Sequence, residues 1–393
     1  MPDPQTPAAL QDTVRLPCPS CGSELQWSAE HKQIVCDYCG YREEMDHSRD
    51  KVVEQSLADA AAKMEDFVPE AVNKKVFDCQ NCGAHFMVES DKVAVNCGFC
   101  GSQNINLEAY AHQYIQPVGI IPFYVSRDEA ERLFKAWIKR GWFRPNALKR
   151  GADLDRLHGI YIPFWTYDAQ TESDWEGEAG TYYYETRTVR VNGKMTQQRV
   201  RRTRWRWHSG HLSHFFDDVL IPATQGLNHD RLERITPYRL PEVVNYDPRL
   251  LVGWESEIYG MEVDEGYQLA DRQMEHLIRN MCSAQLGGDT QRNLRVNSTK
   301  FDQTFKHIIL PVWLSSYQFG GKTYHFSING QTGKLAGDKP YSWVKITLAV
   351  LFVLLLIGAF VYLNELGYFD GGGPRMDTPR DVQPVDPNSF QFE

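Results

Sequence analysis

Residues 18–40 open with Cys18-Pro19-Ser20-Cys21-Gly22 and close with Cys36-Asp37-Tyr38-Cys39-Gly40. The pattern returns 61 residues later as Cys79-Gln80-Asn81-Cys82-Gly83 and Cys97-Gly98-Phe99-Cys100-Gly101. In both groups 14 residues separate the two pairs, which suits a short hairpin that brings the pairs together. Each C-x-x-C turn can direct two sulfur atoms at one ion, and the glycine after each pair tolerates the positive φ of such a turn.

The cysteines therefore predict two zinc ribbons, at residues 16–45 and 76–107, and two Zn²⁺ ions per chain. The expected metal ligands are Cys18, Cys21, Cys36, Cys39, Cys79, Cys82, Cys97 and Cys100. Four thiolates leave no position for a catalytic water, so a structural role is expected. Disulfides and iron–sulfur clusters are the alternatives, and the matched C-x-x-C-G pairs favour zinc. A unit of about 30 residues is too small for a core of its own, so metal binding must supply its folding energy.

The composition is that of a folded chain with two or three domains. The 393 residues are 42% hydrophobic and 12% aromatic, which excludes wholesale disorder. The formal net charge of −9 disfavours a globally basic nucleic-acid binder, although a local basic patch is compatible with it. Residues 1–17 lack the basic start and apolar core of a signal peptide.

The pattern along the chain predicts an α+β fold. Residues 1–15 are expected to be a disordered lead, and 46–75 a helical linker with its helix over 48–66. Residues 108–341 are expected to form an α+β cytosolic domain, with one helix starting at a Ser126–Glu129 capping box and another over about 264–284. The leftover Cys282 lies on the apolar face of the second helix, which predicts core packing.

An apolar–Pro–apolar–aromatic pattern occurs three times, at residues 121–124, 162–165 and 310–313. One interpretation is a duplicated helix-plus-strand unit. The other is that proline marks the start of each strand.

Residues 346–364 carry no charge, and this predicts a transmembrane helix over 343–364. Trp343 and Tyr362 lie where an aromatic belt is expected. Lysines precede the segment and acidic residues follow it, so the N-terminal bulk should be cytosolic. Residues 365–393 are then a disordered extracytoplasmic tail, and the protein should be located in the cytoplasmic membrane.

Residues 187–206 hold eight Arg or Lys and no acid, with a hairpin-turn signal at Asn192-Gly193. Four interpretations stay open: nucleic-acid phosphate, anionic lipid, an acidic protein partner, or a solvated ribbon. In the last case an acidic run would balance the charge, namely Glu172, Asp174, Glu176 and Glu178.

Two other features do not support an activity. Gly320-Gly321-Lys322-Thr323 resembles the end of a P-loop, but the residues after it alternate like a strand, so no nucleotide site is expected. His208, His211 and His214 would point apart on a strand, which disfavours a metal site. No set of catalytic residues stands out, so the chain is predicted not to be an enzyme.

Residues 18–40, 75–101, 162–171, 310–314 and 329–334, followed by the apolar segment, resemble a bacterial family of double zinc-ribbon, single-span membrane proteins. Members are labelled PriA-like or TFIIB-type zinc-binding, yet this chain has no Walker A motif and no room for helicase lobes. The resemblance implies companions of SPFH and PspA-type membrane-stress proteins. We therefore expect a membrane-anchored zinc-ribbon adaptor that binds protein partners, and the alternative is a membrane-tethered nucleic-acid-binding protein.

Overall fold

The computed structural model describes residues 17–43, 52–60, 74–79, 85–89, 105–108, 115–140, 145, 157–191, 194–225, 227, 229–251, 254–319 and 322–366. Two compact units divide the chain. The first comprises Met1–Arg140 and Asn146–Lys339, and the second comprises Gly141–Pro145 and Pro340–Glu393.

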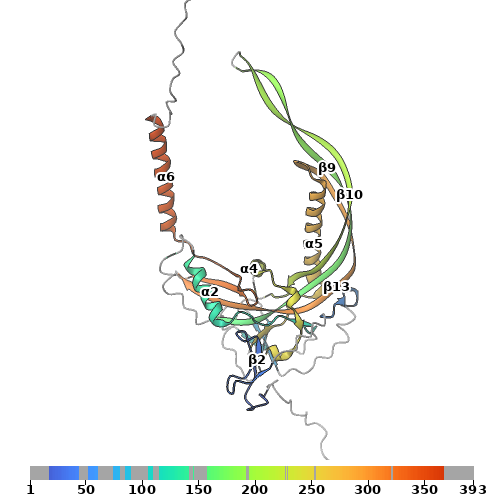
Figure 1. The fold of residues 1–393 in the computed structure, drawn as a ribbon, viewed down its shortest axis with the longest axis vertical. Coiled ribbons are helices and arrows are strands. Elements are labelled where there is room, and N and C mark those ends of the chain that lie inside the picture. The colour runs from blue at the N-terminus through green and yellow to red at the C-terminus, as the bar shows by residue number, and fades with distance from the viewer. Residues whose placement is uncertain are drawn as a thin grey trace, which may run out of the picture. The chain divides into compact units, whose positions relative to one another are not determined.

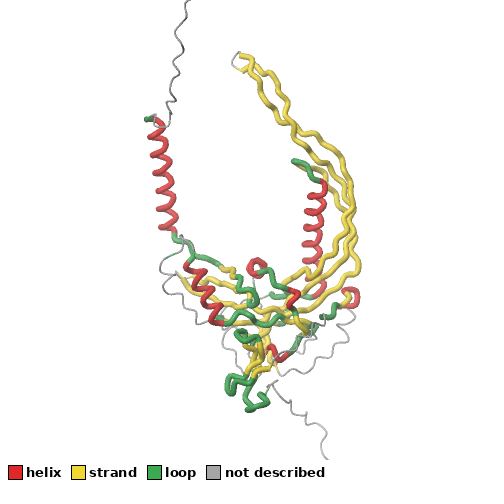
Figure 2. Tube along the Cα trace, in the orientation of Figure 1, coloured by secondary structure: helices red, strands yellow, loops and turns green. Residues whose placement is uncertain are grey.

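The first unit consists mostly of strands (Figure 2). Its strands are β1 (Gln26–Ser28), β2 (Gln33–Val35), β3 (Arg42–Glu43), β4 (Gln55–Ser56), β5 (Lys74–Cys79), β6 (His85–Glu89), β7 (Ile105–Glu108), β8 (Gly119–Ile120), β9 (His158–Val191), β10 (Lys194–Pro222), β11 (Val244–Asn245), β12 (Glu255–Glu257), β13 (Thr290–Phe319), β14 (Lys322–Asn329) and β15 (Leu335–Gly337). Its helices are α2 (Arg127–Lys139), α4 (His229–Ile235) and α5 (Val263–Leu286), with short 3-10 helices η1 (Leu57–Asp59), η2 (Leu240–Glu242) and η3 (Pro248–Leu251).

The strands form two sheets. β1, β2 and β3 make a three-stranded sheet around the first cysteine group, and the others make a 12-stranded sheet. The long strands β9 and β13 lie at its centre and pair antiparallel from Gly180↔Thr290 to His158↔Leu314. β10 pairs with β9 along nearly its whole length, and the register includes Lys194↔Val191.

Three β-bulges bend the long strands. The register shifts between Phe216 and Val219 in β10, and at two places in β13. Each bulge contains an Asp or Asn with positive φ: Asp218 (55°), Asn293 (56°) and Asp302 (52°). Asp and Asn are the non-glycine residues that adopt this conformation most readily, and bulges increase the bend of a strand. Figure 1 shows β9, β10 and β13 curving together, with α5 along their concave side.

Helix α5 covers this side because its apolar residues recur at helical spacing. Its buried residues include Ala270, Met274, Ile278 and Cys282, so the predicted core position of Cys282 is confirmed. Gly266 permits a close approach, since a Cβ there would lie 2.3 Å from the Tyr167 hydroxyl. That hydroxyl donates to the carbonyl of Val263 at 2.6 Å, which ties the start of α5 to β9.

The two helices predicted in residues 108–341 are confirmed. Ser126 is the N-cap of α2, and its hydroxyl accepts from the Glu129 backbone N–H at 3.3 Å. Helix α5 extends the predicted 264–284 by one to two residues at each end. The strand predicted after Gly320-Gly321 is also confirmed, because β14 begins at Lys322 and pairs with β13.

Two expectations differ from the structure. The helix expected over 48–66 is not present at residues 52–59, which hold β4 and η1 instead. β4 forms because Gln55 and Ser56 pair with Phe305 and Thr304 of β13, so tertiary pairing overrides helix propensity. Pro163 and Pro311 do not mark strand starts, because both lie inside long strands, opposite Ile309 and Tyr161.

The second unit contains helix α6 (Trp343–Glu365). Residues Trp343–Asn364 are long and apolar enough to cross a membrane, and the most apolar part of this segment is not buried. The described chain is thus a mixed α and β structure with one apolar helix near its C-terminus.

Candidate metal centre and cationic arm

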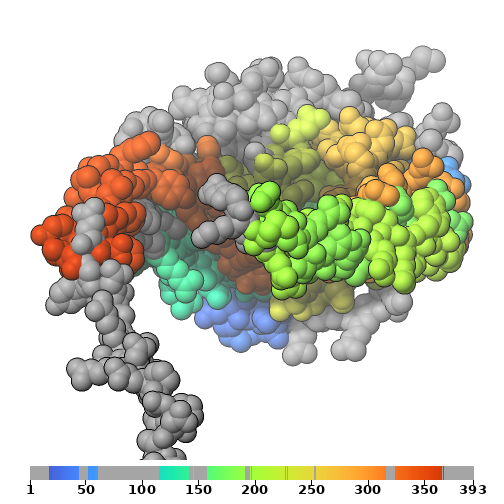
Figure 3. Space-filling model, turned by 90° about the horizontal axis from the view of Figure 1, so that it is seen from above, coloured from blue at the N-terminus to red at the C-terminus, as the bar shows by residue number. Residues whose placement is uncertain are grey.

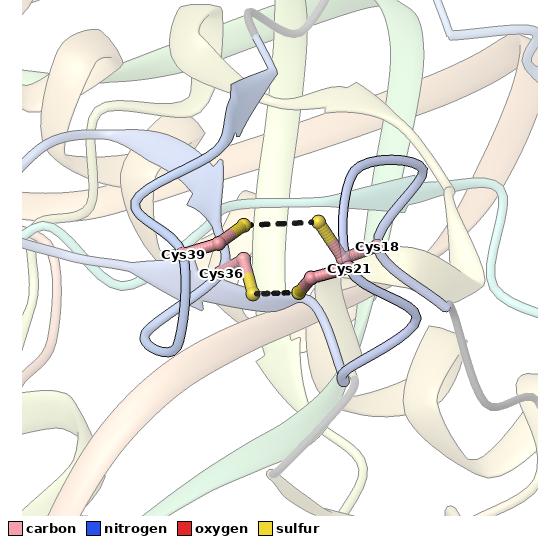
Figure 4. A group of neighbouring side chains, drawn as sticks. All are labelled: Cys18, Cys21, Cys36 and Cys39. Atoms are coloured by element: carbon pink, nitrogen blue, oxygen red, sulfur yellow. Dashed lines mark hydrogen bonds between the residues drawn. The ribbon is translucent and has the colours of Figure 1, made fainter.

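Cys18, Cys21, Cys36 and Cys39 converge, as the sequence predicted. Their sulfur atoms all lie within 4.8 Å of one another. Figure 4 shows Cys18 facing Cys39 and Cys21 facing Cys36, with Sγ–Sγ distances of 3.4 and 3.6 Å. A disulfide needs a separation of about 2 Å. A tetrahedron with Zn–S bonds of about 2.3 Å has sulfur–sulfur edges of about 3.8 Å. The spacing therefore suits a metal ion and not a disulfide.

Two matching backbone turns position these sulfurs. In each turn the glycine N–H donates to the carbonyl of the first cysteine: Gly22 to Cys18 at 2.8 Å, and Gly40 to Cys36 at 2.9 Å. Both glycines have positive φ, 74° and 76°, as their sequence position predicted. A side chain at either position would strain the turn and displace the adjacent cysteine.

The thiols influence one another strongly. The backbone of Cys39 lowers the pKa of Cys36 to about 7. A hydrogen bond from the Tyr41 backbone lowers the pKa of Cys39. The hydrogen bonds between the Cys39 thiol and the thiols of Cys18 and Cys21 outweigh this effect and raise the pKa of Cys39 to about 12. Thiols this close resist ionising one after another, and a divalent cation at their centre would allow all four to be thiolates. The donor set thus fits one zinc ion, which these four residues would hold.

The first cysteine group is packed onto the rest of the unit. Trp27 of β1 is 3% exposed, and its indole N–H donates to the carbonyl of Phe123 at 2.8 Å. Cys18 and Cys36 share one buried cluster with residues from α2, β13 and β14, namely Phe134, Trp313 and Phe326. Arg249 of η3 also bonds Glu43 of β3 at 2.9 Å. This group therefore packs on the core of the first unit through Trp27, Cys18 and Cys36.

The second cysteine group lies largely outside the described residues. Cys82, Cys97 and Cys100 are not described, and of Cys79 only the backbone is, at the end of β5. β5 pairs with β6 and β7, and β6 pairs with β12 through Met87↔Ser256. The strands of this region thus join the large sheet. A second zinc ion stays a prediction from the sequence.

The basic hairpin is confirmed as the distal part of β9 and β10, and we call residues 181–191 and 194–206 the arm. Its arginines stack on tyrosines of the opposite strand: Arg199 lies 4.8 Å from the Tyr184 ring centroid, and Arg201 lies 4.4 Å from that of Tyr182. Figure 3 shows this part of the chain, in light green, uncovered by other described segments in that view.

The acidic run in β9 has partners outside the arm. Glu178 forms bonds of 2.8 and 2.9 Å with Arg292 of β13, and Glu176 lies 3.6 Å from Arg295. His211 of β10 contacts Glu172 at 2.6 Å and Asp174 at 2.8 Å, and these contacts raise its pKa. His208 and His214 alternate with His211 along the strand and so lie on its other face, as predicted.

Sequence reasoning missed a buried charge cluster around Lys306 of β13. Its ammonium lies 2.6 Å from Asp218, 3.3 Å from Glu54 and 3.7 Å from Asp168. Burial raises the pKa of Asp168, which also accepts from Thr304 at 3.0 Å. These residues are 50 to 250 positions apart, so no local motif signals the cluster. Lys306 thus links Asp168 of β9 and Asp218 of β10 with Glu54, which directly precedes β4.

Comparisons with known proteins identify one similar protein and no function. "Uncharacterized protein YdjG" of Bacillus subtilis (strain 168) is 26% identical over 364 residues, which cover 91% of this chain and 98% of the relative. The similarity therefore extends over nearly the full length of both proteins. No family model matches the chain, and no solved structure matches it.

Proposed function

We propose that the protein is a membrane-anchored zinc-ribbon adaptor, which binds protein partners at the cytoplasmic membrane through its cytosolic bulk. The observation that carries this proposal is helix α6. It is long and apolar enough to cross a bilayer, it is not buried, and it begins only a few residues after the last strand of the folded unit. In water such a helix would expose large side chains from Leu348 to Phe360, whereas a bilayer would cover them.

The metal centre supports an adaptor rather than a catalyst. Four cysteine ligands complete a tetrahedral coordination sphere, so no position is left for a substrate or a water. The centre also lies where the small sheet packs on the body, which favours a structural task for the ion. We extend the same assignment to the second cysteine group, which gives two zinc ions per chain.

The proposed orientation places the cysteines in the cytosol and residues 365–393 outside. Thiolate zinc sites persist in a reducing compartment, and Lys334, Lys339 and Lys345 precede the apolar helix. Assembly with SPFH or PspA-type proteins is the specific form of the proposal that the family resemblance implies.

Fractionation of the full-length protein tests the anchor. Alkaline carbonate should leave it in the membrane pellet, and deletion of residues 343–393 should release it. Protease added to spheroplasts should remove only the residues after 364. Digestion of the cysteine groups from outside would reverse the orientation, and carbonate extraction of the intact chain would refute the anchor.

Elemental analysis of the detergent-purified chain tests the metal content independently. Two zinc ions per chain are expected. Cys39→Ser should remove one of them, and Tyr38→Ala, which alters an 84% exposed side chain in the same turn, should retain both. A chain that holds no zinc after reducing preparation would contradict the assignment.

A further inference from the structure

The outer edge of β10 has no strand beside it in the part of the chain that the structure describes. Among the described strands, β10 pairs with β9 alone. β9 also pairs with β13, but this pairing ends at Gly180↔Thr290, before the arm begins. In an antiparallel strand alternate residues direct their N–H and C=O groups outward. The edge of β10 therefore presents backbone donors and acceptors at every second residue.

The outer edge of β9 in the arm begins differently. The backbone N–H of Tyr182, just beyond the end of β13, donates to the Asp289 carboxylate at 2.7 Å. An acidic side chain from the turn before β13 thus occupies the first position along this edge. The edge of β10 is the more open of the two.

The arm carries strong positive charge. Residues 181–206 contain eight basic side chains and one acid, Glu185, so the net charge is +7. Because the whole chain has a formal net charge of −9, the residues outside the arm have a net charge of −16. The acidic run Glu172–Glu178 does not neutralise the arm, because its carboxylates bond Arg292, Arg295 and His211. In the described contacts, the acidic run is thus paired with residues outside the arm.

Three of the arginines are held in place by stacking on tyrosines, and a fourth, Arg202, lies 3.5 Å from the Glu185 carboxylate. Arg204 lies 5.4 Å from the Tyr183 ring centroid, and Arg199 and Arg201 stack in the same way on the other face. Stacking uses the flat face of the guanidinium and leaves its N–H donors, which lie in its plane, free for oxyanions. Ordering these side chains beforehand reduces the entropy lost on binding.

We propose that the edge of β10 at residues 199–207 binds an extended acidic segment of a protein partner as an added strand. This inference rests on one part of the proposed function, namely that the chain binds a protein partner. On one face, acidic residues at alternate positions of the segment would lie opposite Arg202, Arg204 and Arg206, which repeat at the strand period of about 6.8 Å. On the other face, the segment would meet Trp205 and Trp207, and the latter is 57% exposed.

Charge and length favour this occupant over the others. A second copy of the arm is repelled, because both arms carry +7. A long polyanion such as nucleic acid would extend past the arm towards the rest of the chain, whose formal net charge is −16. A segment of about nine residues stays within the arm, and its backbone can pair with the open edge.

The experiment uses the full-length protein in detergent at physiological salt. The probe is a fluorescent ten-residue peptide of alternating Glu and Thr, and its binding is followed by fluorescence anisotropy. Changing Arg202, Arg204 and Arg206 together to Gln should weaken binding roughly 3- to 100-fold, since three cross-strand ion pairs are lost. The matched control changes Arg187, Arg190 and Lys194 to Gln. It removes the same charge away from residues 199–207, so its effect should be smaller.

A second peptide distinguishes strand addition from simple charge attraction. It has the same charge with proline at alternate positions, so it cannot pair with a strand edge, and it should bind much more weakly. Equal binding of the two peptides, equal effects of the two triple variants, or no binding of the Glu/Thr peptide would overturn the proposal. So would tighter binding of a 20-nucleotide single strand or of phosphatidylglycerol vesicles. Each variant should still hold its zinc and stay in the membrane pellet, so failure here is distinguishable from failure of the anchor.

Discussion

Loss of one zinc ligand should destabilise the whole first unit and not only the cysteine group. Cys39→Ser is the suitable change, because Cys39 is an exposed ligand whereas Cys18 and Cys36 are buried. Without its ion the small sheet loses the constraint that fixes β1, so Trp27 is no longer held against the body. Truncating a buried Trp costs about 3–5 kcal/mol, and the lost hydrogen bond to Phe123 adds about 1 kcal/mol.

Part of this contact survives because residues 17–43 stay attached to the chain, so we expect a net loss of about 3 kcal/mol. For a domain of this size each kcal/mol shifts Tm by about 2–4 °C, which gives a decrease of roughly 6–12 °C. Near-UV circular dichroism of the detergent-purified chain measures the transition, and Tyr38→Ala is the control that should leave Tm unchanged. A Cys39→Ser protein that has lost one zinc and still melts at the parental temperature would refute the coupling between metal centre and core.

Three further changes test other parts of the fold. Gly266→Ala should destabilise by about 1–3 kcal/mol in chemical denaturation, because the new methyl group would meet the Tyr167 hydroxyl; Gly358→Ala, with open space around it, should not. Burial lowers the pKa of His307 to about 4. The neutral side chain therefore stabilises the fold above pH 6.5, and about 3 kcal/mol of the free energy of unfolding should be lost as the pH falls from 6.5 towards 4. In His307→Gln the free energy of unfolding should depend less on pH over this range. Ser126→Ala should cost about 1 kcal/mol in thermal unfolding by removing the cap of α2, and Ser126→Asp should restore it.

Features fixed by neighbouring residues were predictable from the sequence. The C-x-x-C-G spacing located the first cysteine cluster, because each turn is closed by a bond between residues four apart. The cap at Ser126 located α2, and Asn192-Gly193 located the hairpin, since β9 and β10 pair directly on either side of it. The alternation after Lys322 likewise distinguished a strand from a P-loop.

Features fixed by distant residues were not predictable. Residues 52–59 carry helix formers, yet β13, some 250 positions later, imposes a strand on Gln55 and Ser56. The packing of Trp27 on Phe123 and the ion pair between Glu43 and Arg249 have no local signature. The positions of the three bulges depend on the pairing of β9 with β10 and β13, which no local pattern reveals.

The packing of the first cysteine group on the body also sets an order of events during synthesis. The group has all its ligands once Cys39 is made, but its partners Trp313 and Phe326 follow about 280 residues later. At about 5–20 residues per second, Trp27 and Ile34 wait roughly 15–60 s for the surface that buries them. Helix α6 begins only 17 residues after Phe326, so the nascent chain gains its last core strands and its most apolar segment almost together. The nascent chain therefore exposes the apolar side of the small sheet until shortly before it exposes helix α6.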